Sequence, residues 1–94
     1  MTDLEKKVRK EIGALIDPET GLTFDKMGLI KEVKEEKPGV IRIDFIPTSP
    51  FCPIAFKFAV DIKKKAESLK DVKKVFVYCH GHVMEEAINK MVNK

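Results

Sequence analysis

A cysteine stands between two prolines in the stretch TSPFCPIAF, residues 48–56. Cys52 directly precedes Pro53, and proline is favoured in the first turn of a helix because its missing N–H is not needed there. The sequence therefore predicts Cys52 at the N-cap of a helix. Unpaired amides and the helix dipole stabilise an anion at such a position, where thiols ionise more readily. Cys52 is thus a candidate for a reactive thiolate, and an ordinary half-buried cap residue is the alternative.

The stretch CHGH, residues 79–82, places three metal-ligating side chains within four residues. Zinc, iron and copper sites use such ligands. A complete four-ligand site needs every cysteine and histidine of the chain, namely Cys52, Cys79, His80 and His82. Against this, strand alternation predicts that Cys79 is buried, and His82 can simply begin a helix. A disulfide between Cys52 and Cys79 is a further alternative, disfavoured in a reducing cytosol.

Polar residues in two predicted loops are candidates to assist the thiol. Thr48 and Ser49 precede the cysteine and offer hydroxyl donors, while the stretch DPETG, residues 17–21, offers two carboxylates. Asp17 and Glu19 can act as an acid–base pair or as a helper to a thiolate. The competing interpretation is turn formation, because Asp and Pro are typical turn residues.

Three amphipathic segments predict helices. The first, residues 3–16, opens with a capping box and ends before a proline. The second is expected over residues 53–69, with lysines near its C-terminus, where the dipole favours cations. A third helix follows CHGH, with an apolar stripe made of Val83, Ala87, Ile88 and Met91. Residues 22–28 are expected to form a loop.

Three segments predict β-strands at residues 29–35, 40–46 and 74–79. The connection KPG between the first two is short, which indicates an antiparallel hairpin. Alternation in the second strand divides its side chains between a buried face and a mostly wet face. The buried set is Ile41, Ile43 and Phe45, and the wet set is Arg42 and Asp44.

The order of elements is α-β-β-α-β-α, which predicts an α+β fold. A three-stranded mixed sheet with helices mainly on one face gives a two-layer α/β sandwich. The second and third strands, joined through a helix, should run parallel with a right-handed crossover. We expect the strand order 2-1-3.

This topology gathers the candidate residues at one rim of the sheet. The second and third strands end there, the first strand begins there, and the DPETG loop must approach the same rim. The predicted neighbourhood comprises Asp17, Glu19, Thr48, Ser49, Cys52, Cys79, His80 and His82.

Length and composition indicate one globular domain, residues 1–94. Hydrophobic residues make up 44% of the chain and charged residues 35%, which excludes a disordered protein. No stretch is long and apolar enough for a membrane span, so a cytoplasmic protein is expected. The net charge is only +3, with no Trp and one Tyr, which gives little support for nucleic-acid binding.

Several quoted segments together carry a family resemblance. They are DPETG, then MGLIKEV, then IRIDFIPTSPFCPI, and finally a strand ending in VFVY. In this order the chain resembles the SufT/PaaD-like family of small iron–sulfur cluster assembly proteins, also called the MIP-eighteen family. The resemblance runs from the first helix through the third strand. Its most specific part is the pairing of D-P-E-x-G with T-S-P-x-C-P.

The resemblance implies a maturation factor for iron–sulfur proteins that acts as a carrier, scaffold or targeting adaptor and not as an enzyme. It implies that Cys52 is the functional thiol, with Thr48 as its close neighbour and Asp17 nearby. The expected cargo is a transient iron–sulfur cluster or iron, and the expected partners are assembly proteins and apo client proteins. Residues 79–94 depart from longer relatives, so the resemblance assigns no role to Cys79, His80 or His82.

Two other classes of function remain open. One is a metal-free protein-interaction adaptor, and the other is a small thiol enzyme or an accessory subunit of a multicomponent oxygenase. One cysteine supplies fewer thiolates than the four of a stable cluster. A homodimer that joins two copies of Cys52 is therefore a further option for the first class.

Overall fold

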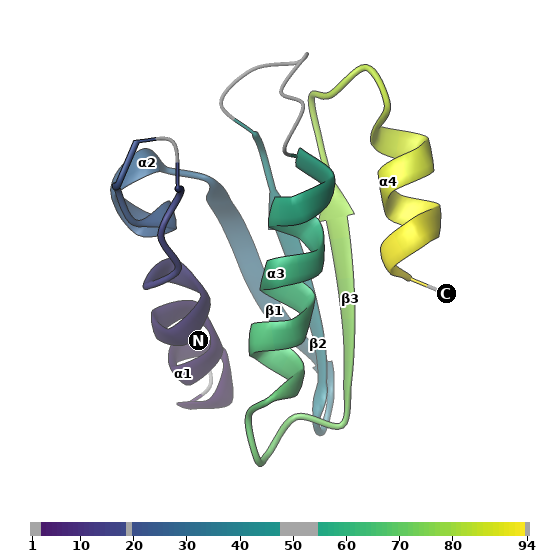
Figure 1. The fold of residues 1–94 in the computed structure, drawn as a ribbon. Helices are drawn as coiled ribbons and strands as arrows, with labels where there is room; N and C mark the ends of the chain where they lie inside the picture. The colour runs from purple at the N-terminus through teal and green to yellow at the C-terminus, as the bar shows by residue number, and fades with distance from the viewer. Residues whose placement is uncertain (1–2, 19, 48–54, 94) are drawn as a thin grey trace.

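The computed structural model describes residues 3–18, 20–47 and 55–93. These residues form four helices and three strands: α1 (Asp3–Gly13), α2 (Phe24–Met27), β1 (Ile30–Lys37), β2 (Val40–Phe45), α3 (Ala55–Glu67), β3 (Lys74–Cys79) and α4 (Glu85–Val92). Figure 1 shows the sheet on one side, with α1, α3 and α4 packed along it. The predicted α+β architecture with a three-stranded mixed sheet is confirmed.

The sheet has the order β1-β2-β3, with β2 in the centre. β2 pairs antiparallel with β1 and parallel with β3, so the predicted strand directions are right and the predicted order 2-1-3 is wrong. β1 has the sequence IKEVKEEK and two register shifts against β2. Charged residues and irregular pairing are typical of an edge strand, while the more apolar VIRIDF of β2 suits the centre.

The helix boundaries differ from the expected ones near the N-terminus. α1 ends at Gly13, and Ile16 instead forms an isolated bridge with Thr23. The short helix α2 lies where a loop is expected. Thr23 caps α2 by accepting a hydrogen bond from the Lys26 N–H, and Gly28 ends it with a φ of 68°. These cap residues are the sequence signal for a helical turn that we did not predict.

The apolar core lies between the helices and one face of the sheet. β2 contributes the predicted buried set, and each of its three members is fully buried. α3 presents its own stripe to the sheet: Ala55, Phe58, Ala59, Ile62 and Ala66. The ring of Phe58 packs edge-on against Phe24, with 4.9 Å between their centroids. This contact joins α3 to α2 across the core.

The last helix buries a different set of side chains from the predicted apolar stripe. Ile88 and Val92 are buried, whereas Val83 and Met91 are exposed. α4 begins at Glu85, so Val83 precedes the helix and lies outside its periodic face. Among the described residues, no helix is both long and apolar enough to cross a membrane.

Candidate functional site

The carboxyl ends of β2 and β3 meet at one rim of the sheet, as the topology predicts. Phe45 lies opposite Cys79 in the parallel pair. The N–H of His80 donates to the carbonyl oxygen of Phe45 at 2.9 Å, and the N–H of Ile46 donates to that of Leu29 at 2.9 Å. Figure 1 shows the start of α3 and the turn before α4 at this same end of the molecule.

Four of the candidate residues lie outside the described part of the chain: Glu19, Thr48, Ser49 and Cys52. The roles predicted for them therefore remain predictions. The described chain stops after Pro47 and resumes at Ala55, and these two residues bracket the segment that carries the cysteine.

Asp17 is buried in the loop between α1 and α2, with an exposed fraction of 3%. Its N–H donates to the carbonyl oxygen of Leu22 at 2.9 Å, and its own carbonyl oxygen accepts from the N–H of Gly21 at 2.8 Å. Gly21 has a φ of 73°, a conformation that glycine adopts without a steric penalty. The backbone of Asp17 thus makes the turn that Asp–Pro predicts, while its role beside the thiol stays a prediction.

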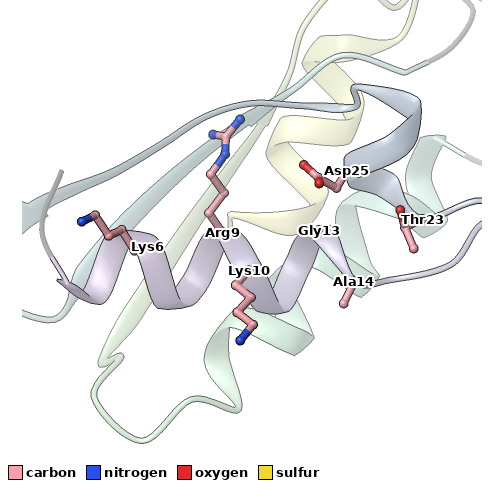
Figure 2. Close-up of a pocket in the computed structure, with 7 residues that line it drawn as sticks. All are labelled: Lys6, Arg9, Lys10, Gly13, Ala14, Thr23 and Asp25. Carbon is pink, nitrogen blue, oxygen red and sulfur yellow. The ribbon is translucent and has the colours of Figure 1, made fainter.

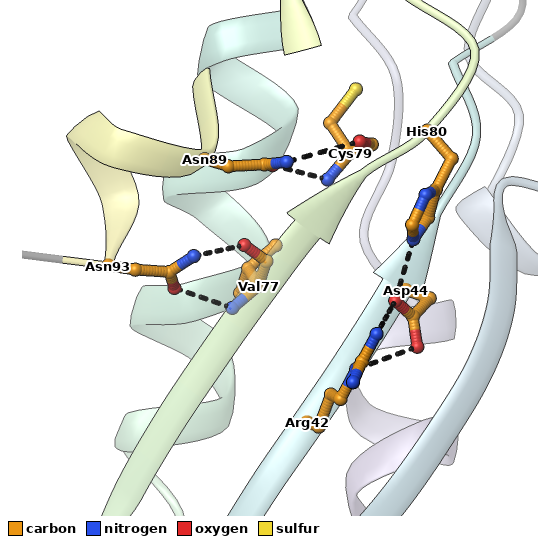
Figure 3. A network of polar contacts seen from close by, with 7 residues as sticks. All are labelled: Arg42, Asp44, Val77, Cys79, His80, Asn89 and Asn93. Carbon is orange, nitrogen blue, oxygen red and sulfur yellow. Dashed lines mark hydrogen bonds and ion pairs between the residues drawn. The ribbon is translucent and has the colours of Figure 1, made fainter. Parts of the chain in front are cut away.

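Cys79 is the last residue of β3 and is completely buried. Strand alternation predicts this burial, and the structure confirms it. The side-chain amide of Asn89 on α4 binds the backbone of Cys79 on both sides (Figure 3), accepting from its N–H at 2.6 Å and donating to its carbonyl oxygen at 3.4 Å. The strand end is therefore held between the core and α4.

His80 follows directly and forms a polar network with two residues of β2 (Figure 3). Its Nε2 lies 2.7 Å from Oδ1 of Asp44, and Nη2 of Arg42 donates to the same oxygen at 3.4 Å. The Nε of Arg42 lies 3.4 Å from Oδ2 in an ion pair that does not form a hydrogen bond. The guanidinium also stacks 4.6 Å above the ring of Tyr78.

This network explains the burial of a residue that the sequence placed on a wet face. Asp44 is only 7% exposed, because Arg42 and His80 cover it from either side. The hydrogen bond and the negative charge of Asp44 raise the pKa of Arg42 above its already high ordinary value. Asp44 is the site residue that sequence reasoning missed, since its partner His80 is 36 positions away.

His82 has a structural position at the start of the turn into α4. It is 7% exposed, and its Nδ1 accepts a hydrogen bond from the N–H of Met84 at 3.0 Å. Gly81 before it has a φ of 74°, which allows the sharp bend between the two histidines. The ring of His82 thus points back into the turn.

The predicted metal set of Cys52, Cys79, His80 and His82 includes one residue outside the described ranges, so it stays a prediction. Within residues 3–18, 20–47 and 55–93, no three side chains of His, Cys, Asp or Glu come together as metal ligands.

A second feature is a pocket of about 450 Å³ between α1 and α2 (Figure 2). It is lined by Lys6, Arg9, Lys10, Gly13, Ala14, Thr23 and Asp25. Arg9 is anchored by donating to the carbonyl oxygen of Ile30 at 3.3 Å. Gly13 leaves space for α2, because a Cβ there would lie 3.2 Å from Cβ of Asp25. Its lining carries three cationic side chains and one carboxylate, so its net charge is positive and favours an anion.

The sequence of this chain is similar to those of known proteins. Residues 5–77 match the family described as iron–sulfur cluster assembly protein. A protein of Methanocaldococcus jannaschii is 36% identical over 90 residues, which cover 96% of this chain and 95% of that protein. The protein named Fe-S protein maturation auxiliary factor YitW of Bacillus subtilis is 28% identical over 75 residues, covering 80% of this chain and 74% of that protein.

A solved structure from Bacillus anthracis, titled as a domain of unknown function DUF59, has a similar fold. Its TM-score is 0.75 at 26% identity, and the alignment covers 95% of this chain and 87% of that one. The matched family is one of assembly and maturation factors and not a recognised family of enzymes. Because the family match spans most of the sequence, the chain belongs to the iron–sulfur cluster assembly protein family, as its motifs predict.

Proposed function

We propose that this chain is a maturation factor that carries iron or an iron–sulfur cluster transiently through the thiol of Cys52. The observation that supports the proposal most is the family match over residues 5–77, which includes the whole D-P-E-x-G and T-S-P-x-C-P pair. A relative of similar length is named a maturation auxiliary factor. Partners on this proposal are assembly proteins that load the cargo and apo clients that receive it.

The positions of the elements on either side of the Cys52 segment support an activity at the rim of the sheet. Pro47 and Ala55 bracket the segment that carries Cys52, and each is attached to an element that ends or begins at the rim. A single thiolate is a soft ligand for iron but leaves its ligand set incomplete, since stable clusters use four thiolates. Incomplete ligation suits a cargo that must leave, and a second copy of the chain can supply a second thiolate.

Anaerobic reconstitution with ferrous iron and sulfide tests the proposal. We expect the wild type to gain visible absorbance of a cluster and Cys52→Ala to lose most of it. Cys79→Ala is the matched control, because Cys79 is buried at the end of β3 and should retain the cluster. Equal absorbance in wild type and Cys52→Ala would contradict the carrier role. Size-exclusion chromatography of the loaded protein reports whether the cargo joins two copies.

A metal-free adaptor is the second candidate, and the basic pocket between α1 and α2 favours it. Among the described residues, neither Lys6 nor Lys10 takes part in an ion pair. An acidic segment of a client or assembly protein would complement this pocket. The test is binding of an apo client to Lys6→Glu/Lys10→Glu, with Lys70→Glu/Lys90→Glu as a charge-matched control elsewhere on the surface. Loss in the first variant alone, with binding retained in Cys52→Ala, supports the adaptor.

A further inference from the structure

The three side chains of the CHGH stretch differ sharply in access to solvent. Cys79 is completely buried and His82 is 7% exposed. The side chain of His80 is 45% exposed. Of these three metal-ligating side chains, His80 is therefore the one that an incoming ion can reach without rearrangement of the core or of the turn before α4.

The contact with Asp44 decides which ring nitrogen of His80 is presented. A carboxylate accepts hydrogen bonds, so the Nε2 atom 2.7 Å from Oδ1 carries the proton when the ring is neutral. The other nitrogen, Nδ1, then keeps its lone pair. Within the described part of the chain, Asp44 is the hydrogen-bond partner of this ring. Metal-binding histidines typically have their second nitrogen held by a carboxylate in this way.

Asp44 is itself fixed in place, which makes it a firm support for the ring. It lies on the central strand, and its side chain is only 10% exposed. The ion pair with Arg42 offsets part of the cost of burying this carboxylate. The stacking of Arg42 on Tyr78 holds the guanidinium in turn. An imidazole held by these successive side-chain contacts loses little conformational freedom when it binds a metal.

The backbone places the same ring at the carboxyl rim. The N–H of His80 donates to the carbonyl oxygen of Phe45, which ties the residue to the end of β2. Gly81 then turns the chain away, so that His80 is the last residue aligned with the strand.

We propose that His80 is a nitrogen ligand for the iron that this protein carries, with Asp44 as its positioning residue. The proposal rests on the proposed carrier function. In the binding step, the Nδ1 lone pair forms a coordinate bond to iron(II) and one water leaves the metal. No electron is transferred, and the neutral ring releases no proton because its proton is on Nε2. On the proposed carrier function, a nitrogen donor in addition to a thiolate gives a mixed and incomplete ligand set, from which cargo can be passed on.

Pulsed electron paramagnetic resonance of the reconstituted and reduced full-length protein, with ¹⁵N-labelled histidine, tests the ligand directly. We expect a hyperfine coupling from ring nitrogen in the wild type and its loss in His80→Ala. His82→Ala is the matched control and should keep the coupling. A wild-type cluster that depends on Cys52 but has no histidine coupling overturns the His80 proposal and leaves the carrier function intact.

Nuclear magnetic resonance of the apo protein provides a test that needs no cluster. We expect the wild-type ring of His80 to carry its proton on Nε2 and Asp44→Asn to show a mixture of both tautomers, because an amide can donate as well as accept. Titration with Co²⁺ alone should broaden the ring signals of His80 and leave those of His82 unchanged. If the proton is on Nδ1, or if Co²⁺ leaves His80 unaffected, the proposal is wrong even where the protein binds no cluster.

Discussion

At the scale of single residues, Asp44 shows how a charge can be buried at modest cost. It lies on the sheet face opposite the helices, where a carboxylate would ordinarily be solvated. Arg42, two positions earlier, and His80, which directly follows the neighbouring strand, cover it, so the charge is shielded by partners instead of water. The same contact fixes the orientation of the His80 ring, although its side chain is partly exposed at the surface.

Gly39 gives a prediction at the residue scale. It has a φ of 82° in the turn between β1 and β2, and a Cβ there would lie 2.9 Å from Cγ of Lys73. We expect Gly39→Ala to lower the free energy of unfolding by about 1–2 kcal/mol for the left-handed conformation, with a further loss for the contact. Urea denaturation measures this loss.

Gly28→Ala is the control for that measurement. Gly28 has a similar φ of 68°, but a Cβ there would meet nothing within 4 Å. It should therefore show the conformational cost without the clash. Equal losses in Gly28→Ala and Gly39→Ala would mean that the contact with Lys73 is relieved at no cost.

At the scale of elements, α4 covers the open edge of β3 with two side chains. Asn93 binds the backbone of Val77 as Asn89 binds that of Cys79, accepting from its N–H at 2.8 Å and donating to its carbonyl oxygen at 2.8 Å (Figure 3). Positions four apart on a helix rise about 6 Å, close to the roughly 6.6 Å between alternate residues of a strand. The two amides therefore fit two successive outward-facing peptide groups of the edge.

Removing both amides should weaken the fold and expose the edge. Each unsatisfied buried group costs about 1–3 kcal/mol, so we expect Asn89→Ala/Asn93→Ala to be clearly less stable than the wild type. Uncovered strand edges also promote association between chains. Thermal denaturation and light scattering measure the two effects.

The outward-facing residue Lys90 lies between the two asparagines in sequence and supplies the control. Lys90→Ala keeps the helix and its length but touches neither amide, so its stability and its scattering should match those of the wild type. A double asparagine variant with unchanged stability would show that water replaces the amides without penalty.

At the scale of the whole molecule, one apolar core joins the four helices of the described chain to one face of the sheet. α1 contacts β1, whereas α3 and α4 both contact β3 (Figure 1), so the strand ends at the rim are attached to this core. The site depends on this core because Asp44 lies on β2 and His80 directly follows β3, two strands whose other face packs in the core.

Phe58 is the strongest test of that core. It is 1% exposed and packs against Phe24. We expect Phe58→Ala to cost about 3–5 kcal/mol, which is a large part of the roughly 5–15 kcal/mol that stabilises a typical domain. Phe56→Ala is the control, since Phe56 is only partly buried and should lose less. Equal losses in urea denaturation would mean that the core collapses around the missing ring.

Local patterns predicted several elements well because they depend on near neighbours. The strand over residues 74–79 has the predicted bounds, and alternation assigns the buried Cys79 correctly. The motifs around Asp17 and Cys52 predict the family, which the match over residues 5–77 confirms. The short helix α2 was missed, although its Thr23 and Gly28 caps were readable in the sequence.

The α+β class, the strand directions and the family can be predicted from the sequence, since each follows from local periodicity or from short motifs. The central place of β2, the two asparagines that cover the edge of β3 and the contact between Asp44 and His80 become visible only in the folded chain. These features arise from contacts between residues distant in the chain. Strand neighbours and side-chain partners are chosen by packing of the whole molecule, which no short stretch of sequence contains.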